Sequence, residues 1–261
     1  MDQGSKRELL EHLVEGLCAE RGHAVPPAES VNGLWRTFRA LVNTRPPIPA
    51  DEGWVGLQDE LLTGLIEEAG ITSLEAVAAS KADGGIRLWQ GDITTLAVDV
   101  IVNAANSQML GCWAPGHHCI DNAIHTFAGV QLRLECARIM EEQGIEEPTG
   151  FAKITGAYNL PSRHVIHTVG PIANGKPTDL HREQLASCYR SCLDLAFQEG
   201  LHSIAFCCIS TGVFGFPQHE AAEIAVKTVR GWLDCTDAPI TVVFNVFSDE
   251  DYGIYAGLLG M

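Results

Sequence analysis

Four potential metal ligands stand within eight residues of this chain: Cys112, His117, His118 and Cys119. Thiolates and imidazoles are ligands that zinc prefers, and a catalytic zinc site uses three protein ligands and leaves one position open. We therefore predict a zinc site formed by Cys112, His117 and Cys119. Adjacent side chains in a loop point in different directions, so His118 is the alternative to His117 as the histidine ligand.

A carboxylate follows this cluster at once in the sequence. Asp121 lies two residues after Cys119 and shares a helix face with His125, four residues further on. Beside a metal, such a carboxylate can orient or deprotonate a water molecule, or hold a metal ligand in place. The alternative is an aspartate that the helix dipole favours in a first turn. For His125, packing in the interior is the simpler interpretation.

Three further polar side chains follow apolar runs that predict strands. Asn103 and Asn106 flank two alanines, where amides can hydrogen-bond ribose hydroxyls and the small neighbours leave room for a sugar. Asp92 comes after a short strand and a glycine, where a carboxylate can accept a hydrogen bond from an adenine amino group. The alternative for all three is ordinary capping of turns and loops.

Two glycines, Gly212 and Gly215, lie between an apolar strand and a helix that starts near Pro217. Glycine lets the backbone approach a ligand closely, and successive N–H groups near a helix start bind anions. The loop therefore suits a diphosphate, although a plain strand-to-helix turn has the same composition. The chain contains neither a Walker A loop nor a Rossmann fingerprint, so those two modes of nucleotide binding are excluded.

The elements that must position these residues alternate between strands and helices from about residue 84 onward. Apolar runs predict strands over residues 86–90, 98–103, 151–155, 164–169, 203–209 and 240–247. Helical spacing predicts helices over residues 121–140, 183–199, 217–233 and 249–259. This alternation predicts an α/β fold with three layers, α/β/α, around a mixed central sheet. Ligands of such sheets bind beyond the carboxyl ends of the strands, where the polar residues described above lie.

Residues 1–80 have a different character. Apolar residues recur with helical spacing in three segments, which proline-rich stretches separate at Pro26–Pro27 and Pro46–Pro49. We predict an N-terminal helical extension over residues 1–80, followed by the α/β domain over residues 81–261. No residue of the extension suggests chemistry, so we interpret it as a packing layer or a surface for a partner.

The charge balance argues against nucleic acid as a partner. The chain has 261 residues, with 17 basic and 33 acidic side chains and a formal net charge of −16. Such a surface repels phosphates. No run approaches the roughly 18 apolar residues that cross a bilayer, so we expect no membrane association. The first residues lack the apolar segment of a secretion signal, and we expect a cytoplasmic protein whose nine cysteines stay reduced.

Four separate segments resemble the ADP-ribose-binding macrodomain family. They are Gly91–Ile93, Val102–Asn106, Ile120–His125 and Ser210–Gly215, and their order and spacing match the family from about residue 84 onward. Most hydrolytic macrodomains carry a run of glycines before the aspartate-containing helix, and residues 111–119 replace that run here. This departure is similar to the zinc-containing microbial macrodomains, which are protein-ADP-ribose hydrolases with an N-terminal helical extension.

The resemblance implies a role for the loops that would hold the adenosine and the diphosphate. Asp92 and Ile93 would hold the adenine end, with Phe247 against the ring. The diphosphate would be wrapped by the backbone N–H groups of the loop formed by Ser210, Thr211, Gly212, Val213, Phe214 and Gly215.

The resemblance also implies which residues meet the distal ribose. Asn106 would contact this ribose and serve the reaction together with Asp121, which matches the catalytic aspartate of the hydrolytic members. Cys112, His117 and Cys119 would ligate Zn²⁺ close to the same sugar. We therefore expect ADP-ribose as ligand and product, and a mono-ADP-ribosylated protein as substrate.

Three functions fit these residues. The first is a zinc-dependent hydrolase that removes mono-ADP-ribose from modified protein side chains, with water attacking at the distal ribose. Zinc with an open position can bind a ribose hydroxyl, polarise the leaving oxygen or supply a hydroxide. The second is a non-catalytic reader of ADP-ribose, which a fourth protein ligand such as His118 would favour. The third is a deacylase of O-acyl-ADP-ribose, a free metabolite with the same distal end.

Overall fold

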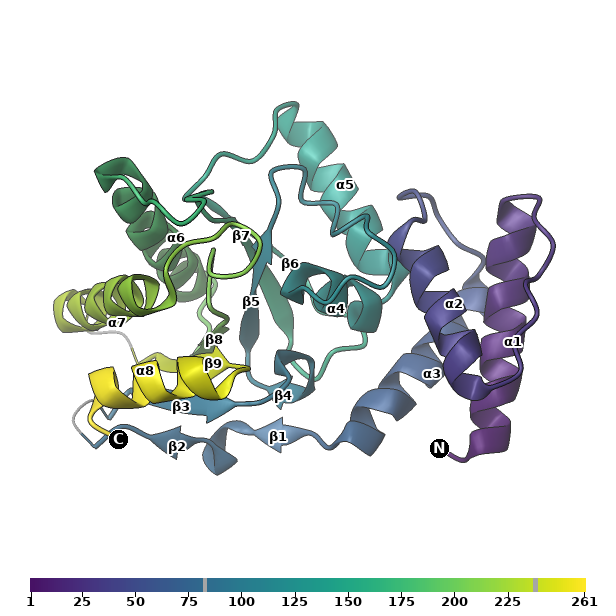
Figure 1. The fold of residues 1–261 in the computed structure, drawn as a ribbon, viewed down its shortest axis with the longest axis horizontal. Helices are drawn as coiled ribbons and strands as arrows, with labels where there is room; N and C mark the ends of the chain where they lie inside the picture. Colours follow the sequence, from purple (N-terminus) through teal and green to yellow (C-terminus); the bar gives the residue numbers. More distant parts are fainter. Residues whose placement is uncertain (82–83, 237–238) are drawn as a thin grey trace.

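The molecule consists of an α/β domain with a bundle of three helices at one end (Figure 1). The structure is a computed structural model that describes residues 1–81, 84–236 and 239–261. Across these residues, no helix combines the length and the apolar character needed to cross a membrane. Both parts follow the predicted order, with three helices first and alternating strands and helices after them.

Seven strands form one mixed sheet in the spatial order β2-β3-β9-β8-β5-β7-β6. The edge strands β2 and β6 are antiparallel to their neighbours, while the inner strands run parallel to one another. The strand bounds are Ala78–Ala79 (β2), Ile86–Gln90 (β3), Val100–Ala105 (β5), Ala152–Gly156 (β6), His164–Val169 (β7), Ser203–Phe206 (β8) and Thr241–Val246 (β9). The predicted mixed sheet is confirmed.

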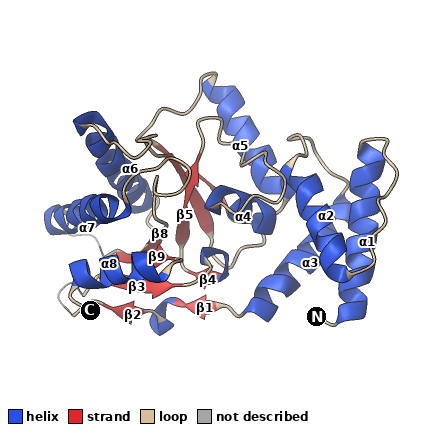
Figure 2. Cartoon of the chain, in the orientation of Figure 1, coloured by secondary structure: helices blue, strands red, loops and turns tan. Residues whose placement is uncertain are grey.

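Helices cover both faces of this sheet and give the predicted three layers (Figure 2). Helices α4 and α5 pack on one face, and α6, α7 and α8 pack on the other. Their bounds are Ile120–Ala128 (α4), Val130–Gln143 (α5), Asp179–Gln198 (α6), Gln218–Cys235 (α7) and Asp249–Leu259 (α8). Because β5 lies between the two helical layers, its residues Val100–Val102 are fully buried and apolar.

Two predicted elements are shorter than the apolar pattern suggests. The helix predicted over residues 121–140 is two helices, because Gly129 between α4 and α5 has a φ of +100°, which other residue types rarely adopt. A Cβ atom at this position would lie 2.6 Å from Nε2 of Gln58. The strand predicted over residues 203–209 ends at Phe206, where the chain leaves the sheet. Apolar periodicity encodes neither of these backbone features.

The N-terminal extension forms a bundle with an apolar core of its own. Its helices are Gln3–Glu20 (α1), Val31–Asn43 (α2) and Glu52–Ala69 (α3). Trp35 of α2 packs against Phe127 of α4, with ring centroids 5.7 Å apart. Gln58 of α3 is 1% exposed and accepts a hydrogen bond of 3.0 Å from the backbone N–H of Val130. Buried contacts therefore join the extension to the α/β domain.

Two short strands continue this connection. β1 (Thr72–Ser73) pairs in parallel with β4 (Leu96–Ala97) of the α/β domain. β2 falls within the residues predicted as extension, yet it belongs to the seven-stranded sheet. The α-helices of the extension thus end at Ala69. After them, β1 forms a two-stranded sheet with β4, and β2 joins the seven-stranded sheet.

Candidate active site

The carboxyl ends of the parallel strands bring four loops to one edge of the sheet. These loops follow β3, β9, β8 and β5, which is also their spatial order. At the end of β3, the backbone N–H of Gly91 donates a hydrogen bond of 3.0 Å to the carbonyl of Val246, at the end of β9. A ligand that lies along this edge would therefore meet the four loops in that sequence.

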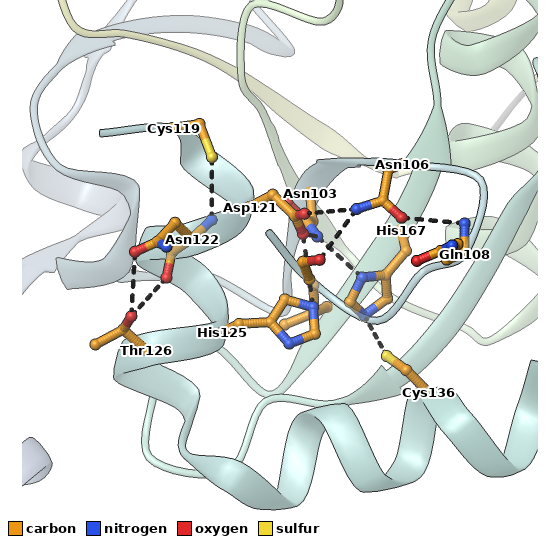
Figure 3. Close-up of polar contacts among 12 residues, drawn as sticks. Asn103, Asn106, Gln108, Cys119, Asp121, Asn122, His125, Thr126, Cys136 and His167 are labelled. Atoms are coloured by element: carbon orange, nitrogen blue, oxygen red, sulfur yellow. Dashed lines mark hydrogen bonds and ion pairs between the residues drawn. The ribbon is translucent and has the colours of Figure 1, made fainter. Parts of the chain in front are cut away.

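Asp121 is buried in the first turn of α4, with 5% of its surface exposed. The side-chain amide of Asn103 donates a hydrogen bond of 2.8 Å to Oδ1, and that of Asn106 lies 3.4 Å from Oδ2 (Figure 3). Burial raises the pKa of Asp121 to about 6, while the Asn103 hydrogen bond and the charge of Arg133 act in the opposite direction. Two amides from the end of β5 therefore fix the orientation of this carboxylate.

Two buried histidines, His125 and His167, lie beside Asp121 and Asn103 (Figure 3). His167 of β7 stands opposite Asn103 in the register of the sheet, and its Nδ1 lies 3.1 Å from the amide nitrogen of Asn103. Burial lowers the pKa of His167 to about 3, so the ring is neutral. Its Nε2 lies 3.0 Å from Oγ1 of Thr155, and Nε2 of His125 lies 3.6 Å from Oδ1 of Asp121. His167 therefore supports Asn103 from the interior, while the ring of His125 packs beside Asp121 without a hydrogen bond to it.

Cys112, His117 and Cys119 come together in the loop that precedes α4. Their ligand atoms lie within 4.8 Å of one another, and Sγ of Cys112 is 3.7 Å from Nδ1 of His117. A sulfur and a nitrogen at the bond lengths of tetrahedral zinc stand about 3.5 Å apart, so this pair fits that ion. His118, which the structure also describes, is not a member of the group. Three ligands fit a metal with one open position.

The loop from Ser210 to Gly215 contains two residues with positive φ, +66° at Ser210 and +63° at Gly215. The backbone N–H of Gly215 donates a hydrogen bond of 3.0 Å to the carbonyl of Gly212 and closes the loop. Within the part of the chain that the structure describes, the N–H groups of Gly212, Val213 and Phe214 donate to no protein acceptor. Adjacent N–H groups of this kind, just before a helix, suit a phosphate.

Asp92 and Phe247 lie at the neighbouring ends of β3 and β9. Asp92 caps the short 3-10 helix Ile93–Thr95 and accepts hydrogen bonds from the N–H group and the hydroxyl of Thr94, at 3.0 and 2.7 Å. Its exposed carboxylate borders a cleft of about 300 Å³ between this turn and the helices of the extension. Phe247 is 80% exposed, whereas Ile93 is 1% exposed and packs in the core. Only the backbone of Ile93 can therefore meet a ligand.

The Macro domain family model matches residues 102–225 of the chain. Over 253 residues, the chain is 51% identical to the protein-ADP-ribose hydrolase of Treponema medium, and the match covers 96% of each chain. The chain belongs to the macrodomain family. It is also 50% identical over 255 residues to the protein-ADP-ribose hydrolase of Staphylococcus aureus strain MRSA252, covering 96% of this macrodomain and 95% of that relative. The resemblance to macrodomains is thus confirmed.

A solved structure shares the fold of this macrodomain. The Trypanosoma brucei macrodomain in complex with ADP-ribose is 32% identical and superimposes with a TM-score of 0.65, covering 85% of this chain and 95% of that one. The predicted α/β fold is confirmed by this likeness together with the sheet topology.

One predicted ligand contact lies in the interior of this macrodomain. Asn103 was expected to meet a ribose hydroxyl, but its side chain has no exposed surface. Side chains of a strand alternate between the two faces of a sheet, and Asn103 points toward the face that α4 covers. In this position the amide holds Asp121 instead of reaching a ligand.

The sequence does not indicate that several further residues contact the loop of residues 112–119. The guanidinium of Arg133, on α5, lies 4.2 Å from the ring centroid of Trp113, in the loop of residues 112–119. Arg39 and Asn43 of α2 hydrogen-bond to the same loop, from 78 and 73 residues away in the chain. Their spacing of four residues shows only that they share a helix face, and not what that face contacts.

Proposed function

We propose that this macrodomain is a zinc-dependent hydrolase that removes mono-ADP-ribose from modified protein side chains. The relatives named protein-ADP-ribose hydrolase support the reaction, because they match the chain over nearly its full length. The observation that carries the proposal is the buried carboxylate of Asp121, held by two amides and only two residues from the metal ligand Cys119. A protein that only binds ADP-ribose would need no such carboxylate.

The order of the strands supports ADP-ribose as the ligand. Along the sheet edge, the ends of β3 and β9 offer Asp92 and Phe247, the loop after β8 offers backbone N–H groups, and β5 leads to Asn106. These three sites suit an aromatic ring, an anion and a sugar. Their order along the edge matches the order of adenosine, diphosphate and ribose in ADP-ribose. The distal ribose would then lie beside Asp121 and the metal ligands.

Hydrolysis at the distal ribose builds positive charge on the sugar and negative charge on the leaving group. The carboxylate of Asp121 can accept a proton from the attacking water or stabilise the charge on the sugar. Asn106 links this carboxylate to the metal-ligand loop, because its amide also donates a hydrogen bond of 3.1 Å to the carbonyl of Gly111. When bound by Cys112, His117 and Cys119, zinc would supply a Lewis acid or a water of lowered pKa.

A paired assay on the purified chain tests this function. We expect about one zinc per chain by mass spectrometry, as a single site with three protein ligands requires. We also expect release of ADP-ribose from a mono-ADP-ribosylated protein, and loss of that release when a chelator removes the metal. Bound zinc and tight ADP-ribose binding without release would make the protein a reader. Release that persists without metal would remove zinc from the proposal.

The adenine contact has its own test. Asp92→Ala is expected to weaken ADP-ribose binding roughly 10- to 100-fold, because a hydrogen bond to a charged group contributes about 1.5–3 kcal/mol. The affinity is measured by calorimetry. Asp51→Ala is the matched control, since Asp51 also caps a helix start, at α3, but lies outside the strand-end loops. An affinity that Asp92→Ala leaves unchanged would refute the adenine assignment.

A further inference from the structure

Helix α2 of the extension lies beside α4 and beside the loop that carries the metal ligands (Figure 1). Two polar side chains of α2, Arg39 and Asn43, are four residues apart and share the helix face that meets the loop. Asn43 is 1% exposed, although it is polar and stands at the end of an amphipathic helix. Burying a side-chain amide destabilises the folded protein unless the amide makes hydrogen bonds there.

Asn43 makes one hydrogen bond to the loop and one to helix α4. Its Oδ1 accepts from the backbone N–H of Gly116 at 2.9 Å, and its Nδ2 donates to Oγ1 of Thr126 at 3.0 Å. Gly116 has a φ of +64°, so this point of the loop is a turn that the hydrogen bond holds. Thr126 in turn donates to the carbonyl of Asn122 at 2.7 Å. A single side chain therefore ties the loop to the helix that contains Asp121.

Arg39 repeats this arrangement one turn earlier on α2. Its Nη2 donates to the carbonyl of His117 at 3.3 Å and to Oδ1 of Asn122 at 2.7 Å. The Nδ2 atom of Asn122 donates to the carbonyl of Ala114 at 3.2 Å. The backbone between Cys112 and Cys119 is thus held at three positions. Arg39 holds residue 117, Asn43 holds residue 116, and Asn122, the partner of Arg39 on α4, holds residue 114. Three backbone contacts in so short a segment leave its ligands little freedom.

We propose that Arg39 and Asn43 are positioning residues for the metal, through which the N-terminal extension presets the geometry of the Cys112, His117 and Cys119 ligands. The proposal rests on the metal site of the proposed function. Groups that orient metal ligands from outside the coordination sphere typically contribute about 10- to 100-fold to metal affinity. Here they lie in the N-terminal helical bundle, so its packing against α4 would serve the metal site.

Zinc affinity of the full chain, measured by competition with a chromophoric chelator, tests this proposal directly. We expect Asn43→Ala and Arg39→Ala each to weaken zinc binding about 10- to 100-fold. The matched controls on the same helix are Asn32→Ala and Arg36→Ala, because both side chains are exposed. The controls are expected to retain the affinity of the unmodified chain. The visible spectrum of the cobalt-substituted protein reports the ligand geometry, and we expect it to change only in the first two variants.

The outcomes separate this proposal from the function on which it rests. Asn43→Ala removes a buried amide and can therefore impair folding. If it does, Arg39→Ala tests the proposal, because Arg39 is only half-buried. Lower thermal stability with unchanged zinc affinity would mean that the two residues only join the domains, which overturns the proposal. Unchanged zinc affinity in folded Arg39→Ala and Asn43→Ala also overturns this proposal, but it does not contradict the hydrolase function. Absence of zinc binding by the unmodified chain overturns both.

Discussion

Asp121→Ala is expected to slow the release of ADP-ribose about 100- to 10,000-fold, the usual contribution of a positioned acid or base. The carboxylate is buried and accepts a hydrogen bond from Asn103 at 2.8 Å, and alanine has no group that could accept a proton or carry a negative charge in its place. ADP-ribose binding should persist, because the adenine and diphosphate loops belong to other strands. Single-turnover kinetics on a mono-ADP-ribosylated protein and calorimetry with ADP-ribose measure the two effects separately.

Two further variants make this result specific. Asp121→Asn keeps an oxygen that can accept the hydrogen bond from Asn103 but removes the negative charge, and we expect nearly the same loss of turnover. Asp179→Ala removes an exposed aspartate from the first turn of α6 and should leave turnover unchanged. Full turnover in Asp121→Asn would contradict a charge-based role for this carboxylate.

Much of the fold follows from the apolar pattern, and the exceptions have identifiable causes. The strands over residues 86–90 and 164–169 and the helix over residues 249–259 have the predicted bounds. The break between α4 and α5 depends on one glycine with positive φ, and the helical pattern continues across it. The spacing of apolar residues indicates which face of a helix or strand is buried, but it does not indicate where the backbone turns.

The candidate site likewise has features that the sequence predicts and features that it does not. The strand-end rule places Asp92, Asn106 and the loop of residues 210–215 at one edge, because parallel strands share that edge. The place of Asn103 depends on its pairing with His167, 64 residues away, which no local pattern encodes. The contacts of Arg39 and Asn43 depend likewise on how helix α2 packs against α4 and the loop before it. The place of these loops at one edge of the sheet was therefore predictable from the sequence, while the contacts that hold their side chains were not.

Cys119→Ala is expected to abolish zinc binding and turnover together. Loss of a direct ligand should lower zinc affinity by more than the about 10- to 100-fold that follows the loss of a residue orienting a ligand. Zinc content by mass spectrometry and release of ADP-ribose are measured on the same preparation. Cys235→Ala is the control, because Cys235 is an exposed cysteine of α7 outside the ligand group, and it should change neither quantity.

Cys119 also caps a helix, and the choice of variant must separate this role from its proposed role as a metal ligand. Its sulfur caps helix α4 by accepting from the backbone N–H of Asn122 at 3.4 Å. Serine is among the most favoured helix caps and alanine is not, while the serine hydroxyl is not among the usual zinc ligands. Cys119→Ser should therefore keep or improve the start of α4, and with it the place of Asp121, while zinc and turnover are lost. If Cys119→Ser releases ADP-ribose at the full rate without metal, the carboxylate acts alone, and the Cys-His-Cys group serves only to shape the loop.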